Sequence, residues 1–453
     1  MNGRPNVMSA PPTMNHNFAP VINKKPRPAT VASFFFGVLG VSICEVGFIS
    51  AHFSFLGRTI ENRSRQRKHP LGTLVIYTRF YNLIVLLVLL HGTCACSTPH
   101  ETNITAINIV PQGVDQWAVR TTGSSKLIID GIEQKDRYQR VPGSTHHTVQ
   151  FADKVYQLPS RDVDNCGVIR FVALGDGRAD VNHIGPSAYW PGILHEVYTR
   201  QPTFILNTGD LVKRGHRIHE WINFFHQTRV LPPMVSVRGN HDRGGLFETF
   251  IAVDRFVHWF RWGAVGVVGF DTEILDHELE ASLALLDKTL MSLNSHWKIL
   301  FLHRPIWSRG NHGSNERGWN EKLIPIIDRH SVDIVIAGHD HNYERFCASR
   351  GFHPSNRCAD SGFGTTYIVT GGAATFTNPV PGISKHVVGD VKKADALASR
   401  VFSGAHHFID FSASAHRLHA TVRRTRTGNL FGAGIIDEFT FDKRNERCQK
   451  TSR

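Results

Sequence analysis

Five short apolar runs in the second half of the chain have the pattern of buried β-strands. Each is four to six residues long, and each is followed at once by glycine and polar residues. Parallel strands covered on both faces have this continuous apolar composition, and ligands bind outside their carboxyl ends. The predicted strands are Ile169–Leu174, Thr203–Asn207, Met234–Val237, Ile299–Leu302 and Asp333–Ala337.

Helical stretches alternate with these runs, as expected of a layered α/β core. They are Tyr189–Arg200, Leu279–Leu293 and Glu321–Arg329. The flanking regions are β-like instead. Four short β-like runs precede the core (Ala106–Val110, Trp117–Arg120, Lys126–Ile129 and His147–Phe151), and three follow it and are expected to complete a sheet (His407–Phe411, Arg417–Arg423 and Gly434–Phe441). We therefore predict a small β-rich region at 98–165 and an α/β domain at 166–445.

The first hundred residues have a different character. Residues 1–28 are rich in Pro and Asn without an apolar period, which predicts disorder. Residues 29–97 contain two hydrophobic stretches, Val31–Leu56 and Leu74–Cys96, separated by a basic run. The second stretch looks like the apolar region of a secretion signal, because its core Leu83–Leu90 is short for a membrane span of ~20 residues. Residues 29–97 are thus predicted to be a targeting or membrane-anchor region.

The basic run Arg58–His69 indicates orientation, because basic flanks stay on the cytoplasmic side. The domain after Ser97 is then expected to be extracytoplasmic: periplasmic, secreted or membrane-anchored, with membrane contact through 29–97. Whether 74–96 is cleaved, retained or acylated at Cys94 or Cys96 is left open. So is a start of translation near residue 74, which would need a codon other than AUG. Two core helices of a soluble domain are the less favoured reading.

The net charge of +13 first invites a nucleic-acid partner. Residues 1–100 hold ten Lys/Arg and two acids, a balance of +8, which leaves +5 for the rest of the chain. The basic character belongs to the N-terminal segment, and no nucleic acid is expected as a partner. Among the seven cysteines, Cys347 and Cys358 flank a polar loop and are the best pair for a disulfide in an oxidising compartment.

Polar motifs follow the five predicted strands and carry the candidate chemistry. They are Gly175-Asp176-Gly177, Gly209-Asp210, Gly239-Asn240-His241-Asp242, His303 and Gly338-His339-Asp340-His341. The strand ends would bring two Asp, one Asn and four His to one place. Such a set suits a two-metal site that clamps a phosphate: a carboxylate bridges, an amide oxygen and neutral imidazoles complete the shells, and Fe, Zn or Mn fit. This pattern predicts a metal-dependent hydrolase.

The order of these motifs resembles the calcineurin-like metallophosphoesterase superfamily. Gly338-His339-Asp340-His341-Asn342-Tyr343-Glu344-Arg345 is similar to its purple acid phosphatase branch, as are His303-Arg304-Pro305 and the segment 367–372. The resemblance extends over about residues 105–442 and is loose before 160. It implies an α/β fold: a four-layer α/β/β/α sandwich with a small N-terminal β-rich extension and metals at the strand ends.

The resemblance also implies residue roles, for two divalent or trivalent metal ions (Fe, Zn or Mn). Asp176 and His341 would bind the first metal, and Asp210 would bridge the two metals. Asn240, His303 and His339 would bind the second metal. His241 would be the catalytic residue that contacts the phosphate and protonates the leaving group.

Two positions depart from the family pattern. Lys213 stands where purple acid phosphatases have the tyrosine that gives the colour, so no purple band is expected. Arg178 stands where other members have a histidine, which leaves His183 or water as the fourth ligand of the first metal. Arg178 itself either points at the substrate phosphate or is a surface residue. His312 lies near a phosphate-facing histidine of the family, and an exposed loop histidine is the favoured reading.

The leading hypothesis is a phosphatase that acts on small phosphomonoesters. A phosphodiesterase or nucleotidase is the second, because the same site serves both ester classes. A binding protein on a decayed phosphatase scaffold is the third, supported only by Arg178 and Lys213. Neither substrate nor oligomeric state follows from the sequence.

Overall fold

The computed structural model describes most of the chain after residue 104. The described residues are 105–161, 167–178, 187–229, 231–351, 353–354, 364–373, 377, 399–430 and 432–443. All of them belong to one compact unit, Glu101–Arg453. The expectations for 1–28 and 29–97, and those that involve His183 and Cys358, fall outside the described residues.

The described part begins with two small antiparallel sheets. One has the strand order β1-β2-β5 and the other β4-β3-β6-β7. The four strands predicted in this region are confirmed as β1, β2, β3 and β6, and three further short strands complete the sheets. The strands are β1 (Ala106–Gln112), β2 (Gln116–Thr122), β3 (Leu127–Ile129), β4 (Ile132–Gln134), β5 (Tyr138–Pro142), β6 (His147–Phe151) and β7 (Lys154–Leu158).

A six-stranded sheet follows, with the order β10-β9-β8-β20-β21-β22. Its first three strands in sequence are parallel, and the C-terminal meander joins them through an antiparallel pairing of β20 with β8. The predicted return of the C-terminal runs to a sheet is therefore confirmed. The strands are β8 (Ile169–Leu174), β9 (Phe204–Asn207), β10 (Met234–Ser236), β20 (His407–Ala413), β21 (Arg417–Arg424) and β22 (Gly434–Asp442).

A seven-stranded sheet has the order β11-β12-β13-β14-β18-β15-β19, with β12, β13, β14 and β18 parallel. Its strands are β11 (Val257–Trp262), β12 (Val265–Phe270), β13 (Trp297–Leu302), β14 (Ile334–Ala337), β15 (Tyr343–Phe346), β18 (Thr366–Thr370) and β19 (Ser399–Ser403). The short strands β16 (Ser349–Arg350) and β17 (His353–Pro354) pair separately.

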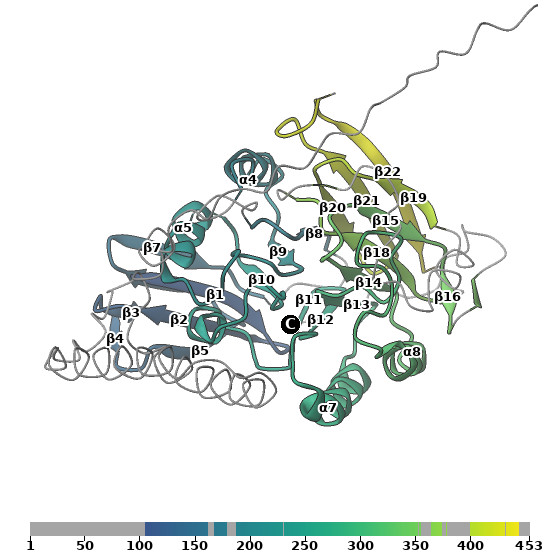
Figure 1. Ribbon diagram of the computed structural model, residues 1–453. Helices are drawn as coiled ribbons and strands as arrows, with labels where there is room; N and C mark the ends of the chain where they lie inside the picture. Colours follow the sequence, from purple (N-terminus) through teal and green to yellow (C-terminus); the bar gives the residue numbers. More distant parts are fainter. Residues whose placement is uncertain are drawn as a thin grey trace, which may run out of the picture. The chain divides into compact units, whose positions relative to one another are not determined.

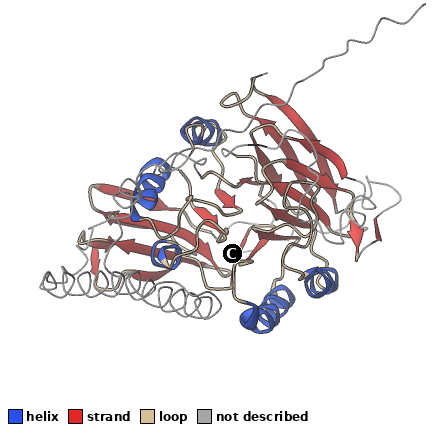
Figure 2. Cartoon of the chain, in the orientation of Figure 1, coloured by secondary structure: helices blue, strands red, loops and turns tan. Residues whose placement is uncertain are grey.

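Helices cover the outer faces of the two large sheets (Figures 1 and 2). They are α4 (Trp190–Tyr198), α5 (Ile218–Thr228) and α6 (Leu246–Phe250) on the six-stranded sheet, and α7 (Leu279–Ser292) and α8 (Asn320–Arg329), with the 3-10 turn η2 (Asp276–Glu278), on the seven-stranded sheet. The predicted helices are confirmed as α4, α7 and α8. No helix in the described part of the chain is long and apolar enough to cross a membrane.

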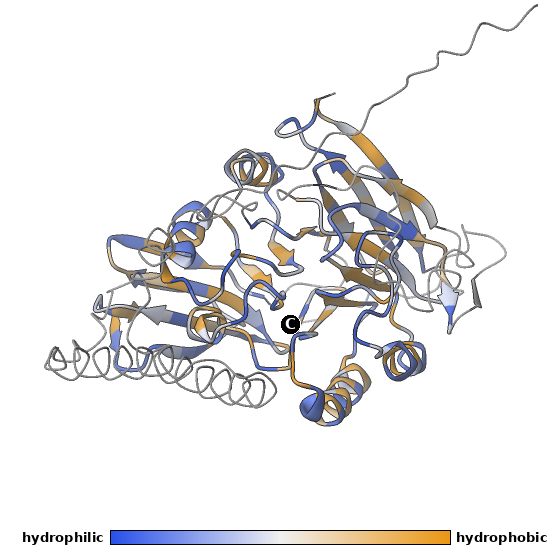
Figure 3. Ribbon diagram, viewed as in Figure 1, coloured by the Kyte–Doolittle hydropathy of each residue, from blue (hydrophilic) through white to orange (hydrophobic). Residues whose placement is uncertain are grey.

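Alternating side chains of the strands build three hydrophobic layers. In β8, Phe171 and Ala173 face the cluster between the sheets, while Val172 and Leu174 face the helices. In β13, Phe301 likewise faces inward and its neighbours face α7 and α8. Figure 3 shows hydrophobic residues along the strands of both sheets. The α/β/β/α sandwich predicted from the resemblance is confirmed.

The parallel strands end in register, which gathers their loops at one edge. Leu174 and Ser236 both pair with Asn207, so β8, β9 and β10 end level with one another. In the other sheet Leu302 pairs with Ala337, so β13 and β14 do the same. Each of these strands is followed by one of the polar motifs. The fold thus positions the motifs through backbone hydrogen bonding in the core.

Arg161 joins the β-rich extension to the sandwich. Arg161 is 4% exposed, and its guanidinium donates hydrogen bonds to the backbone carbonyls of Gln112, Gly113, Gln116 and Arg261. It also lies over the rings of Trp117 and Trp262, 5.6 and 5.5 Å from their centroids. Burial lowers its pKa to about 10. One buried cation therefore satisfies carbonyls from two parts of the fold.

Candidate metal centre

The loops after the strands turn sharply, and several candidate residues have left-handed backbone angles. Asp176, Asp210 and His339 have φ values of 60°, 55° and 70°. The turn at Asp176 is held by its N–H, which donates to the carbonyl of Gly209 at 3.0 Å. Residues other than glycine adopt such angles at a cost, and positions of this kind cluster at functional sites. The turns aim the three side chains back toward the sheet edge.

Glycines let these loops approach the carboxylates closely. A Cβ at Gly239 would overlap Oδ1 of Asp210, and one at Gly338 would lie 2.6 Å from Oδ2 of Asp176. Real Cβ contacts of that length essentially do not occur. The absence of a side chain at both positions is therefore required by the packing of the site, which explains the glycine that opens these two motifs.

Asp210 lies at the centre of the site and is 1% exposed. Its Oδ1 accepts the backbone N–H of His241 at 3.0 Å and lies 3.4 Å from Nε2 of His303, while its Oδ2 accepts Nε–H of Arg178 at 2.9 Å. Burial alone would raise the pKa of Asp210, but His303, His241 and Arg178 more than offset it and lower the pKa. The carboxylate is held ionised.

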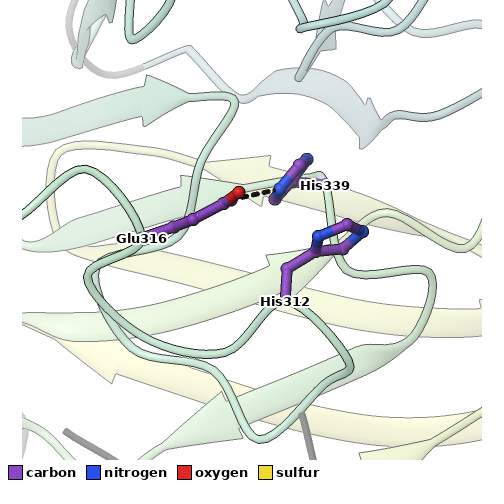
Figure 4. Close-up of side chains that lie close together, drawn as sticks. All are labelled: His312, Glu316 and His339. Carbon is purple, nitrogen blue, oxygen red and sulfur yellow. Dashed lines mark hydrogen bonds and ion pairs between the residues drawn. The ribbon is translucent and has the colours of Figure 1, made fainter. Parts of the chain in front are cut away.

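His303 and His339 each contact a hydrogen-bond acceptor with one ring nitrogen, which orients the ring. Nδ1 of His303 lies 2.8 Å from the carbonyl of Thr208, an acceptor that favours the tautomer with the proton on this nitrogen. Nε2 of His339 lies 2.5 Å from Oε2 of Glu316, as Figure 4 shows. The second nitrogen of each ring, Nε2 of His303 and Nδ1 of His339, is left with a lone pair. Metal-binding histidines are oriented in this way by carbonyls and carboxylates.

These lone pairs converge on one point. Nε2 of His303 lies 3.2 Å from Nδ1 of His339, 2.9 Å from Oδ1 of Asn240 and 3.4 Å from Oδ1 of Asp210. Ligands that each bind one ion at ~2.0–2.2 Å lie roughly 3–3.6 Å apart. Two lone-pair nitrogens this close repel each other unless a cation lies between them. Burial and the neighbouring His303 lower the pKa of His339 well below its usual value, which keeps it neutral. This donor set fits a divalent metal.

The position expected for the first metal has a different arrangement. Nε2 of His341 lies 3.6 Å from Oδ1 of Asp176, and that oxygen is buried without a hydrogen-bond partner among the described residues. The guanidinium of Arg178 lies between the other expected ligand atoms, with Nε 2.9 Å from Oδ2 of Asp210 and Nη2 3.3 Å from Nε2 of His341. A metal does not fit here unless Arg178 moves away.

Arg178 is therefore not the surface residue that one reading expected, and its contact with a substrate phosphate stays a prediction. Its side chain is 13% exposed, so it is not a surface residue, and its Nε bonds a carboxylate of the site. Burial and the nearby Asp210 raise the pKa of Asp176 well above its usual value, although Arg178 acts in the opposite direction. Arg178, which replaces the histidine of the family pattern, is thus part of the centre.

His241 is positioned beside this cluster from two sides. Its backbone N–H binds Asp210, and its ring Nδ1 lies 2.8 Å from the carbonyl of Lys213. Nδ1–H donates a hydrogen bond to this carbonyl and leaves Nε2 as the nitrogen available to a substrate. Burial lowers the pKa of His241. Lys213 serves the site here through its backbone, since its N–H also donates to Oε2 of Glu220 at 2.8 Å.

The loop after β13 folds over the centre because Asp340 binds it. Asp340 accepts the backbone N–H groups of His312 and Gly313 at 2.7 and 3.1 Å and the hydroxyl of Ser308 at 2.6 Å. The ring of His312 packs on that of His339, with centroids 3.9 Å apart (Figure 4). The favoured reading of His312 as an exposed loop histidine is wrong: the residue is partly buried at the site.

Three supporting residues were not found from the sequence. Thr208 and Glu316 orient the two histidines, and Arg304 binds Glu316 with its Nη1 3.2 Å from Nε2 of His339. Glu316 is the one carboxylate in the polar loop 308–320. This makes it a candidate partner once a histidine of the site is known to need a hydrogen-bond acceptor. Its partner in the fold could not be read from the sequence, because the two residues lie 23 positions apart.

Comparison with known proteins agrees with this arrangement. Residues 170–343 match the calcineurin-like phosphoesterase family. Purple acid phosphatase 17 of Arabidopsis thaliana is 34% identical over 84 residues, 18% of this chain and 22% of that protein. Purple acid phosphatase 3 of the same plant is 25% identical over 223 residues, 39% of this chain and 59% of that protein. The chain thus covers less than two thirds of these relatives.

A solved structure shows the same fold. The purple acid phosphatase PPD1 from yellow lupin (Lupinus luteus) seeds superposes with a TM-score of 0.59 at 16% identity, over 75% of this chain and 74% of that chain. The segment that matches the phosphoesterase family, residues 170–343, contains the ends of all five strands that carry the polar motifs. Residues 170–343 thus form a calcineurin-like phosphoesterase domain, and the relatives that this chain is similar to include purple acid phosphatases.

Proposed function

We propose that this protein is a metal-dependent hydrolase that removes phosphate from small phosphomonoesters. The observation that carries the proposal is the convergence of three ligand atoms, from Asp210, Asn240 and His339, at 2.9–3.4 Å from a fourth, Nε2 of His303. Two of these atoms, Nε2 of His303 and Nδ1 of His339, are ring nitrogens that lie 3.2 Å apart. Four loops thus contribute ligands to one cation site at the edge of the sheets, within a domain that matches the phosphoesterase family.

A metal bound there would be Fe, Zn or Mn, and it would supply positive charge to the phosphate oxygens and activate water for attack on phosphorus. The chain's own residues supply the rest. Asp210 holds the centre through an ionised carboxylate, and Glu316 and Thr208 fix the rings of His339 and His303. These contacts pre-organise the ligands, so that little rearrangement accompanies catalysis.

His241 is the proposed general acid. The carbonyl of Lys213 holds its ring through Nδ1, and its backbone N–H binds the same Asp210 oxygen that faces the metal ligands. The free Nε2 is therefore held beside the place where a bound phosphate would lie. Protonated, it gives its proton to the leaving oxygen as the P–O bond breaks, which typically contributes 10²–10⁴-fold in rate.

The test uses the full chain with p-nitrophenyl phosphate, with and without a chelator, and after reloading with Zn²⁺, Mn²⁺ or iron. We expect metal-dependent hydrolysis that His241→Ala lowers at least 100-fold in kcat, whereas His277→Ala, an exposed histidine on η2, leaves it unchanged. Faster hydrolysis of bis-p-nitrophenyl phosphate would favour a phosphodiesterase instead. No hydrolysis of either ester by metal-loaded protein would favour a binding protein on a decayed scaffold.

We also propose an extracytoplasmic location, with membrane contact through residues 29–97. Cys347 is disulfide-bonded, and disulfides persist mainly in oxidising compartments. Maleimide labelling of the denatured protein, taken from cells with thiols blocked, should modify Cys347 only after reduction. Protease added to sealed cells should digest the part after Ser97. Labelling of Cys347 without reduction, or protection from protease, would contradict the proposal.

A further inference from the structure

We infer that the centre of this chain holds a single metal ion and that the guanidinium of Arg178 takes the place of a second one. The inference rests on the proposed function only in taking the cluster as a metal centre. The donor set around His303 fits one ion, as its lone-pair geometry indicates. The neighbouring position is already filled by a side-chain cation of the protein.

The contacts of Arg178 are those that a metal would make. Its Nε bonds Oδ2 of Asp210 at 2.9 Å, and its Nη2 lies 3.3 Å from Nε2 of His341. The other oxygen of Asp210, Oδ1, faces Nε2 of His303. A metal would have to approach each of them to ~2.0–2.2 Å, within the volume that the guanidinium occupies. The ion and the side chain therefore exclude each other.

The backbone holds Arg178 in this place. The N–H of Arg178 donates to the carbonyl of Asp210 at 3.1 Å, so Arg178 binds both the main chain and the carboxylate of the same residue. The preceding residue is also held, because the carbonyl of Gly177 accepts the N–H of Ser187 at 3.1 Å. A side chain attached this way is pre-organised, and its planar fork suits a carboxylate.

The charges of the centre agree with one ion. Asp176 and Asp210 are 0% and 1% exposed, and between them can carry two negative charges. One guanidinium and one divalent ion offset these and leave a single positive charge for a phosphate. Two divalent ions beside the guanidinium would leave three positive charges in a buried site, where like charges repel strongly.

Metal stoichiometry of the full chain tests the inference without using activity. After loading separately with Zn²⁺ and Mn²⁺ and removing free ion, we expect one ion per chain by elemental analysis and by calorimetry. The Mn²⁺ form should give the magnetic resonance spectrum of isolated ions. Two ions per chain, or the spectrum of an exchange-coupled pair, would overturn the inference even in an active enzyme.

Variants separate the role of Arg178 from that of the fold. Arg178→His removes the guanidinium and adds an imidazole, and we expect two ions per chain. Arg217→His adds a histidine at an exposed position near the same loops and should leave one. Asp176→Asn should also leave one ion, because the His303 cluster does not need that carboxylate, whereas a two-metal centre would lose an ion. A folded Arg178→His protein with one ion would refute the exclusion by Arg178. Loss of hydrolysis with stoichiometry intact would count against the proposed function alone.

Discussion

Glu316 should control how tightly the centre binds metal, although it is not expected to touch the ion. Its Oε2 accepts Nε2–H of His339 at 2.5 Å, which fixes the ring and keeps the lone pair on Nδ1. In Glu316→Gln the amide can still contact the ring, but the negative charge that makes the imidazole a better donor is lost. The expected result is weaker metal binding in a protein that remains folded.

The size of the effect follows from the surroundings of the carboxylate. Loss of an outer partner of a metal-binding histidine typically weakens metal binding 10–100-fold. The side chain of Glu316 is 31% exposed and also binds Arg304, so solvent and a neighbouring cation already screen its charge. We therefore expect the lower end, about tenfold in Kd or ~1.4 kcal/mol.

The assay is competition of the full chain against a chromophoric chelator for Zn²⁺ at constant pH and ionic strength. Glu280→Gln serves as the matched control, because Glu280 forms an exposed ion pair with Lys322 on the α7–α8 surface. That variant should bind like the wild type. An unchanged Kd in Glu316→Gln, with circular dichroism like that of the wild type, would refute the assignment of Nδ1 of His339 as a ligand atom.

Three further predictions concern other parts of the fold. Burial raises the pKa of Glu344 from 4.5 to about 7, so its protonated form stabilises the fold below pH 4.5 and this contribution is lost as the pH rises through 7. Between pH 4.5 and 7 the free energy of unfolding of Glu344→Gln should therefore rise by about 3 kcal/mol relative to that of the wild type, measured by urea unfolding. Parallel pH profiles of the two proteins would contradict this. Arg161→Met leaves four backbone carbonyls without their donor and should lower the free energy of unfolding by roughly 3–5 kcal/mol, whereas a loss below 1 kcal/mol would show that water replaces the guanidinium. Gly239→Ala should weaken Zn²⁺ binding by more than tenfold because its methyl group displaces Asp210, while Gly131→Ala, whose Cβ meets nothing, should not; equal affinities would rule out the close approach at Gly239.

The sequence predicted the parts of the fold that depend on local pattern. The runs that end at Asn207 and Leu302 were found because strands buried on both faces are continuously apolar and are followed by glycine or polar residues. The hairpin of β11 and β12 was missed, because neither VHWFRW nor VGVVGF shows a clear alternation of apolar and polar residues. The order of strands within each sheet was also beyond reach, since the pairing of β20 with β8 joins segments more than 200 residues apart.

The candidate site divides in the same way. The six expected ligand residues and His241 all lie at one edge of the sheets, and their roles remain predictions. The position of Arg178 could not be predicted, because a loop arginine has many rotamers and only the packed structure shows which carboxylate it meets. His312 was misjudged for a related reason: its place depends on Asp340, which draws the loop inward from the far side.

The left-handed angles of Asp176, Asp210 and His339 have a consequence for the evolution of this chain. Each costs roughly 1–2 kcal/mol compared with glycine at the same angle, against a total stability of about 5–15 kcal/mol for a typical domain. Selection for heat resistance alone should thus enrich glycine or asparagine at these three codons. Their retention in a lineage would record purifying selection on chemistry, and their loss would be the earliest genetic trace of a descendant that has stopped being an enzyme.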